Sequence, residues 1–311
     1  MKNWQIKVSL FLNYFVFAIL LNSVGTVILQ VQNNFDVSKS SASILEACKD
    51  LSIALFSFLV ASYITRLGYK RSMLIALGLV SVACFMMPSL STFAMTKVLF
   101  MVVGASFALI KMSVYGTIGL VTSDEKEHIS FMSFIEGFFM IGILTGNYVF
   151  SLYVDDNNPK SLEWFKIYYL LGGLSLVALF LLWSAPLDET TAKSPAKKDI
   201  ADEFSEMFKL LAIPLVMVFV LCAFFYVLIE QSIMSWLPTF NKEVLKLPTS
   251  ISIQMAIILP ASTAIGRFLA GLVLQKIDWF VALTGCLIAA AGLVLLAIPL
   301  AQGIDASHAT G

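Results

Sequence analysis

A lysine in the middle of a long apolar run raises a chemical question. Lys111 belongs to the stretch SFALIKMSVYGTIGL, and the apolar run around it extends from about Phe100 to Thr122. An unpaired ammonium near the centre of a bilayer costs about 3 kcal/mol on insertion scales, so such a lysine normally faces a partner or a water-filled cavity. We therefore expect Lys111 to serve the function of the protein, provided that this run spans a membrane.

Carboxylates in other apolar runs could neutralise Lys111. It lies about 13 residues before the middle of the loop that ends its run, and Glu136 lies about 12 residues after it, so a rise of 1.5 Å per residue places both at nearly the same depth. Three interpretations stay open: an ion pair that only joins two helices, a substrate-binding lysine whose charge Glu136 tunes, and a pair with Asp50. Glu46 and Asp50 share a helix face with Lys49 beside them, which equally fits an exposed vestibule.

A further carboxylate, Glu230, lies inside the run VLIEQSIMSWL, about ten residues before the loop that follows. A carboxylate removed from water at that depth can exchange a proton near neutral pH. We expect Glu230 to bind a coupling proton and, with Gln231 and Asn22, the hydroxyl groups of a substrate. The alternative is a structural acid that is hydrogen-bonded to a neighbouring helix. The predicted substrate-binding residues are Asn22, Lys111, Glu136, Glu230, Gln231 and Trp236, and the predicted proton-coupling residues are Glu230 and Glu136.

Composition places the chain among polytopic membrane proteins. Of its 311 residues, 59% are hydrophobic and 13% are charged, and the mean hydropathy is +0.88; no water-soluble core of this size needs so much apolar surface. The net charge of zero and the lack of a basic patch argue against nucleic-acid binding. His128 and His308 lie in polar segments, and no HExxH or GxSxG pattern occurs, so we expect neither a metal site nor an enzyme.

Hydropathy at about 20 residues per span predicts nine transmembrane helices and an all-α fold. They cover residues 6–30, 41–64, 72–92, 97–121, 129–153, 164–185, 210–239, 250–275 and 279–301. A polar segment divides them into an N-terminal six-helix half (1–185), a cytoplasmic linker (186–209) and a second half of three helices (210–311). Because six helices are followed by only three, we expect the second half to be incomplete, with three more helices after Gly311.

The loops indicate the orientation of the chain. With a cytoplasmic N-terminus, the inner loops hold eleven lysines and arginines and the outer loops six, as the positive-inside rule requires. The tryptophans lie at predicted span ends, as interfacial anchors do: Trp4, Trp164, Trp183, Trp236 and Trp279. We expect a monomeric multi-pass protein of a bacterial inner membrane, with lipid and a small-molecule substrate as its partners.

Two segments of the chain repeat. The turn ASYITRLGYKR after the second span corresponds to GLVLQKIDWF after the eighth, and LNSVGTVI from Leu21 aligns with EQSIMSWL from Glu230 at an offset of about 210 residues. Two repeats in the same order, each opening with a helix that carries Asn or Gln near mid-membrane, are typical of the parallel halves of a transporter.

The turn ASYITRLGYKR also resembles the loop signature GxxxDRxGRR of the major facilitator superfamily. Ala61 and Thr65 replace its first glycine and its aspartate, whereas Arg66, Gly68, Lys70 and Arg71 are retained. Within that superfamily the chain is most similar to the fucose-type sugar:proton symporters, through LN and LQVQNNF in the first span, FFYVLIEQSIMSWL in the seventh and IGRFLAGLVLQKI in the eighth.

This resemblance implies a major facilitator-like bundle that moves a small polar solute, expected to be a sugar, by proton-coupled alternating access. It implies no cofactor, because the proton gradient is the driving force. The signature residues Arg66, Gly68 and Arg71 would serve gating, and Arg267 would either form an inner gate or be structural. Ser23 and Lys111 stand where fucose-type symporters carry carboxylates, so their coupling mechanism cannot be transferred unchanged. Export of amphipathic drug-like compounds, or a non-transport membrane protein, is the alternative.

Overall fold

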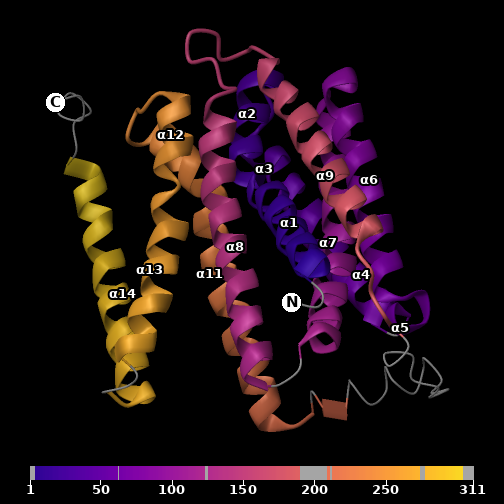
Figure 1. Ribbon diagram of the computed structural model, residues 1–311. Helices are drawn as coiled ribbons and strands as arrows, with labels where there is room; N and C mark the ends of the chain where they lie inside the picture. Colours follow the sequence, from indigo (N-terminus) through magenta and orange to yellow (C-terminus); the bar gives the residue numbers. More distant parts are fainter. Residues whose placement is uncertain are drawn as a thin grey trace.

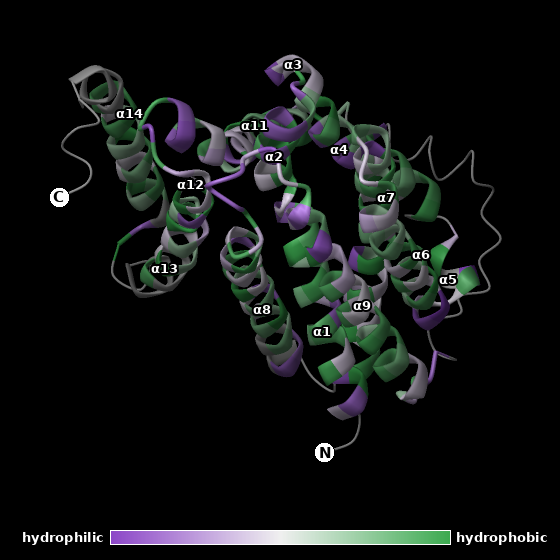
Figure 2. Cartoon of the chain, turned by 90° about the horizontal axis from the view of Figure 1, so that it is seen from above, coloured by the Kyte–Doolittle hydropathy of each residue, from purple (hydrophilic) through white to green (hydrophobic). Residues whose placement is uncertain are grey.

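The long apolar runs of the chain fold into a bundle of helices (Figure 1). The computed structural model describes residues 4–61, 63–122, 125–189, 209–210, 212–273 and 277–303, and these residues include no β-strand. Figure 2 shows apolar residues along the helices and hydrophilic residues mainly in the loops and at helix ends. Apolar side chains are what a bilayer selects. Helices are selected as well, because every backbone polar group within the bilayer must be satisfied inside its own helix.

The N-terminal half contains the first six predicted spans. The first span is broken once, at Ser23, and short helices α3 and α5 precede and follow the second. The elements are α1 (Trp4–Asn22), α2 (Val24–Phe35), α3 (Lys39–Ala42), α4 (Ile44–Ala61), α5 (Ile64–Leu67), α6 (Tyr69–Leu90), α7 (Phe93–Val121), α8 (Glu125–Ser151), the 3-10 helix η1 (Glu163–Lys166) and α9 (Ile167–Ser184).

The second part of the chain contains α11 (Pro214–Glu243), α12 (Thr249–Met255), α13 (Ile258–Val273) and α14 (Trp279–Gly303). All nine predicted runs are therefore helical. The prediction that the seventh helix begins at residue 210 was early by four residues. A proline is favoured in the first turn of a helix, and Pro214 occupies that place in α11.

Seven stretches of the described residues are long and apolar enough to cross a membrane: 4–35, 69–90, 93–121, 131–151, 163–184, 214–243 and 249–266. Helix α4 is not among them, and it carries Glu46, Lys49 and Asp50 in its first half. In α14 the apolar stretch is shorter, Phe280–Leu296. The fold is that of an all-α, multi-pass membrane protein.

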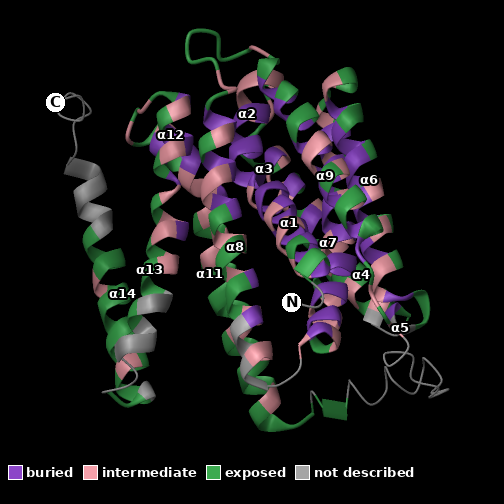
Figure 3. Cartoon of the chain, viewed as in Figure 1, coloured by how far each residue is buried: buried purple, intermediate pink, exposed green. Residues whose placement is uncertain are grey.

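The N-terminal half has a continuous core (Figure 3). Helix α1 packs on α8, α9 and α7, while α7 packs on α4 and α6, and α6 on α9. Glycine makes one of these approaches very close, because a Cβ atom on Gly104 of α7 would overlap the backbone oxygen of Lys49 in α4. The helices of this half are thus held at defined separations and rotations.

The second part meets the N-terminal half through α11 on α2 and through α12 and α13 on α8. The buried residues of α11 are Ser235, Pro238, Thr239 and Asn241, all in its last nine residues. We call the end of the bundle where α2, α12 and residues 152–162 lie the α2 end, and the opposite one the α5 end (Figure 1). Contact between α11 and the N-terminal half is concentrated at the α2 end.

Helices α2 and α11 run side by side in the register of the sequence repeat. A Cβ atom on Gly25 would lie 2.6 Å from the backbone oxygen of Ser235, which is 210 residues further along the chain. Lys242 donates a hydrogen bond to Asn33, 209 residues before it. The two repeats therefore contact each other at equivalent positions.

Candidate functional site

Glu136 of α8 is the carboxylate best placed for chemistry inside the N-terminal half. The hydroxyl of Tyr115, on α7, donates a hydrogen bond of 2.7 Å to Glu136 Oε1. The ring of Tyr14, on α1, lies 6.2 Å from that of Tyr115. Tyr14 is only 1% exposed, and its hydroxyl has no hydrogen-bond partner. Three helices thus bring a carboxylate, its phenol donor and a second, unpartnered phenol together.

Lys111 lies one helical turn before Tyr115 on the same face of α7. Its ammonium nitrogen is 5.9 Å from the ring centroid of Phe107 and 6.0 Å from that of Tyr115. The α7 residue that meets Glu136 is Tyr115, one turn nearer the shared loop than Lys111. The ion pair that the predicted depth would allow is not formed, because among the described residues no carboxylate oxygen lies within 4.0 Å of Lys111.

The alternative partner of Lys111, Asp50, is engaged elsewhere. It forms an ion pair of 3.3 Å with the neighbouring Lys49, whose side chain is only 4% exposed. Glu136 also has another partner, because it accepts the hydrogen bond of Tyr115. Each carboxylate considered for Lys111 thus has another partner, Lys49 for Asp50 and Tyr115 for Glu136.

Aromatic contacts show which way this face of α7 is turned. The ring of Phe107 lies 6.2 Å from Phe17 of α1 and 6.1 Å from Phe139 of α8. Elsewhere along its length α7 packs closely on α4 at Gly104 and on Tyr69 of α6 at Gly116. Lys111, exposed on the same face as Phe107, is therefore directed to the side of the half where α1 and α8 lie, and α8 also carries the contact with α12 and α13.

The surroundings of Lys111 do not compensate its charge. Aromatic faces contribute about 0.5–2 kcal/mol to a nearby cation, whereas an unpaired lysine at the bilayer centre costs about 3 kcal/mol or more. Lys111 is ten positions before the end of α7 at Val121, so its backbone lies about 15 Å below that end, beyond the reach of its own side chain. An anion or water is therefore needed to stabilise the ammonium of Lys111.

Sequence reasoning missed a set of buried hydroxyl groups on α7. Ser106, Ser113 and Thr117 are fully buried, and their oxygens have no hydrogen-bond partner in the structure. On α1 the Oδ1 atom of Asn13 is also unpartnered, although its amide donates 2.8 Å to the backbone oxygen of Ser9. The spacing of the α7 residues, seven and then four, follows one helix face and is a signal that the sequence did contain.

The residues predicted on the first and seventh spans do not join this cluster. The side-chain amide of Asn22 donates 2.9 Å to Ala18 of its own helix. Glu230 and Gln231 are half-buried, and in the described part of the chain neither forms an ion pair or a hydrogen bond through its side chain. Trp236 packs against the core of the N-terminal half. At the offset of the repeat, Asn22 is level with Gln231, so these residues form a second group nearer the α2 end.

Polar contacts join the two parts at the α2 end. Ser235 of α11 donates a hydrogen bond of 2.6 Å to Glu46 of α4. Lys242 donates to Asn33, and Lys39 forms an ion pair with Glu243. Glu46, one of the charged residues expected in an exposed vestibule, is thus used to bind the second part.

The same end carries two further contacts between the parts. The backbone N–H of Ser250 donates 3.0 Å to Asp156, in the loop after α8. Gln254 of α12 donates 3.0 Å to the hydroxyl of Ser151 at the end of α8. Together with the close approach of Gly25 to Ser235, they make the α2 end a sealed junction.

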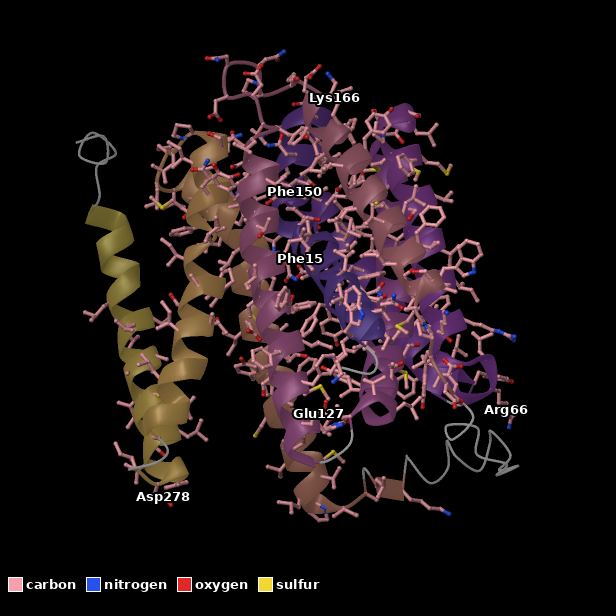
Figure 4. The ribbon with its side chains drawn as sticks, viewed as in Figure 1. Phe15, Arg66, Glu127, Phe150, Lys166 and Asp278 are labelled. Carbon is pink, nitrogen blue, oxygen red and sulfur yellow. The ribbon has the colours of Figure 1, made fainter. Side chains whose placement is uncertain are left out.

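The signature turn lies at the α5 end, where Figure 4 labels Arg66 on the opposite side of the bundle from Lys166. Gly68 has a φ of +91°, which only glycine adopts without strain. This turn starts α6, and the first-turn N–H of Lys70 donates 2.6 Å to Glu189. The ammonium of Lys70 donates to the backbone oxygens of Trp183 and Ala185, at 2.9 and 2.7 Å.

The turn therefore fastens the start of α6 to the end of α9. Sequence reasoning missed Glu189, which it assigned to the linker. Of the predicted gating residues, Arg66 lies 5.8 Å from the ring of Tyr63, and Arg71 is exposed. The side chain of Arg267 lies outside the described residues. No group of His, Cys, Asp and Glu that could hold a metal ion occurs in the described part of the chain.

Comparison with known families agrees with this architecture. The sequence matches the family model described as Major Facilitator Superfamily over residues 10–307. The chain belongs to the major facilitator superfamily. It is accordingly a membrane transporter, and the superfamily expected from the signature turn is confirmed. No curated protein matches this sequence.

Solved structures show the same fold. A D-xylose–proton symporter aligns with a TM-score of 0.65 and 16% identity, over 88% of this chain and 69% of the symporter. The nucleoside transporter NupG aligns with a TM-score of 0.63 and 15% identity, over 88% of this chain and 67% of its own. A mutant of NupG gives 0.67 and 15% identity, over 89% and 68%. At these identities the likeness shows the fold alone.

Proposed function

We propose that this protein is a secondary active transporter that moves a small polar solute, expected to be a sugar, by proton-coupled alternating access. The names of the structural neighbours, a D-xylose–proton symporter and a nucleoside transporter, support a hydroxylated solute. Buried amide and hydroxyl groups without partners beside Tyr115, on Asn13 and Tyr14 of α1, support it from within the chain. Such groups cost free energy unless a ligand or water completes their hydrogen bonds.

Alternating access is supported by where the two parts meet. The first 21 residues of α11 include no buried residue, whereas its last nine include four. A helix of the second part that is buried against the other half only near one end is what one of the two end states of a rocking transporter requires. With the N-terminus in the cytoplasm of a bacterial cell, as the lysine and arginine counts favour, the sealed α2 end is extracellular, and the protein is open inward. We propose that it acts as a monomer in the inner membrane.

The observation that carries proton coupling is the hydrogen bond from Tyr115 to Glu136. An ionised carboxylate accepts this hydrogen bond strongly, and a protonated one accepts it weakly. Loading of a proton on Glu136 therefore loosens the link between α7 and α8. We propose Glu136 as the proton carrier, with Glu230 as the alternative carrier in α11.

Uptake into proteoliposomes tests this proposal. A labelled panel of pentoses, hexoses, hexuronates and nucleosides is offered to the full-length protein with and without an imposed pH gradient. Glu136→Gln is expected to abolish accumulation against a gradient and to retain exchange of solute between the two sides. Glu163→Gln is the matched control, because Glu163 pairs with Lys166 at the surface.

The outcomes separate the two carriers. If accumulation is lost in Glu230→Gln alone, the proton carrier is Glu230 of α11. If the pH gradient drives no member of the panel, proton-coupled transport of polar solutes is wrong for this protein.

A further inference from the structure

We propose that Lys111 binds a carboxylate of the substrate, so that the solute is a sugar-sized polyol with one negative charge, such as a hexuronate. This inference rests on the proposed function and narrows its substrate class. Its starting point is an ammonium near the middle of α7 that is exposed and that no carboxylate of the described residues approaches within 4.0 Å.

The surroundings of Lys111 favour an anion that arrives with the solute. The carboxylate of Glu136 accepts a hydrogen bond of 2.7 Å from Tyr115 and forms no ion pair with Lys111. The rings of Phe107 and Tyr115 lie 5.9 and 6.0 Å from the ammonium. The faces of these rings attract a cation, but they bring no full negative charge of their own.

The groups around Lys111 also fit the rest of a sugar. The hydroxyl of Tyr14 is buried and unpartnered, and its ring packs on Phe139 at 5.5 Å. Phenol hydroxyls can donate to and accept from sugar hydroxyls, and flat aromatic rings suit the apolar face of a pyranose. A single ammonium matches a single carboxylate, which favours a sugar acid over a dianionic phosphate ester.

Charge counting gives this proposal a consequence that can be measured. The empty site holds Lys111 as a cation and Glu136 as an anion, with the neutral phenols of Tyr14 and Tyr115 beside them. A site loaded with one proton on Glu136 and one carboxylate on Lys111 keeps the same net charge of zero. Transport of a hexuronate with one proton is then electroneutral, whereas transport of a neutral hexose with one proton moves one positive charge.

The experiment uses two solutes that differ only at carbon 6, D-glucuronate and D-glucose. The full-length protein in proteoliposomes is given a pH gradient, and the membrane potential is clamped at zero or at about 100 mV with potassium and valinomycin. We expect glucuronate to accumulate equally at both potentials and to be preferred over glucose at least tenfold in competition.

Variants show which residue causes the preference for glucuronate over glucose. Lys111→Gln is expected to remove the tenfold preference for glucuronate, and Lys111→Arg to keep most of it. Lys97→Gln is the matched control on the same helix, because Lys97 also lies over an aromatic ring, that of Phe93 at 4.4 Å, but near the end of α7. The melting temperature of each variant is measured with and without glucuronate at about 10 mM. These temperatures show whether Lys111→Gln is folded and has lost only the binding of the ligand.

Three results would overturn the inference. If glucose accumulates in a potential-dependent manner and Lys111→Gln leaves the solute preference unchanged, the proposed function stands and the role of Lys111 is wrong. If neither sugar accumulates under any gradient and neither protects the protein from heat, both proposals fall. A glucuronate preference that survives in Lys111→Gln likewise assigns the anion to another residue.

Discussion

The α1–α2 span and α11 occupy equivalent places in the repeat, yet their surroundings are opposite. The mean hydropathy of the most apolar 18-residue window is 1.9 in Trp4–Phe35 and 2.2 in Pro214–Glu243. In the first span 89% of that window is buried within the protein, and in α11 none of it is. Hydropathy therefore identifies a membrane helix without identifying what the helix packs against.

Close packing, rather than apolar composition, distinguishes the two regions. In a bilayer, lipid chains are as apolar as a protein core, so helices associate through small residues that permit close contact and through polar groups. Gly104, Gly116, Gly142 and Gly146 all make such contacts in the N-terminal half. In the second part, a Cβ atom added at Gly266, Gly285 or Gly292 would meet no atom within 4 Å.

The largest expected effect comes from filling one of these close contacts. Gly104→Ala places a methyl group against the backbone of Lys49, so α7 and α4 must separate, and we expect a loss of about 3 kcal/mol of stability. Gly285→Ala in α14 is the control, with an expected change within about 0.5 kcal/mol. Thermal unfolding of both variants in detergent checks this prediction. Equal melting temperatures for the two would show that the N-terminal half is not the more tightly packed region.

The junction between the regions should be the next most sensitive place. In Gly25→Ala the new methyl group meets Ser235, and we expect the sealed α2 end to be destabilised by about 1.4 kcal/mol, or tenfold in population. The measurement is the rate of disulfide formation between cysteines introduced by Asn33→Cys and Lys242→Cys. Gly119→Ala on α7, where a Cβ meets open space, is the control. An unchanged cross-linking rate in Gly25→Ala would contradict the proposed seal.

A smaller effect is expected from the polar part of the same junction. Ser235→Ala removes the hydrogen bond to Glu46, which lies at a partly exposed place, and should cost about 1 kcal/mol of contact between the parts. In the same cross-linking assay the rate should fall about fivefold. Ser232→Ala is the matched control, since its hydroxyl bonds only to Leu228 of its own helix. If both serine variants behave alike, Glu46 does not contribute to the junction.

The smallest effect is expected at the signature turn. Glu189→Gln removes the negative charge near the N-terminus of α6, where a carboxylate contributes about 0.3–1 kcal/mol. The melting temperature should fall slightly, and less so at high salt, which screens charges. Glu163→Gln, at the other end of the bundle, should not show this salt dependence beyond its own surface pair with Lys166. A salt-independent loss would mean that Glu189 acts by shape rather than by charge.

Much of the candidate site follows from the order of residues along the chain. Apolar run length predicted nine helical runs. Distance from a shared loop placed Glu136 near Lys111 of α7, and the structure has Glu136 one turn further along α7, at Tyr115. The offset of about 210 residues between repeats predicted which residues of α2 and α11 would be level, and Gly25 with Ser235 and Asn33 with Lys242 follow it. Depth and repeat order are properties of position along a helix, and position along a helix is linear in sequence.

Which side chains contact each other depends on the rotation and spacing of the helices. These are decided only when the helices pack. Tyr115 rather than Lys111 contacts Glu136, although the two α7 residues are one turn apart. Glu46 binds Ser235 instead of lining a vestibule, and Glu189 caps α6 instead of belonging to a free linker. Each of these outcomes depends on helix rotation and on a few ångströms of approach, and hydrogen bonds lose their strength over that distance. The sequence therefore determined which polar groups enter the membrane and at what depth, and tertiary packing decided which of them meet.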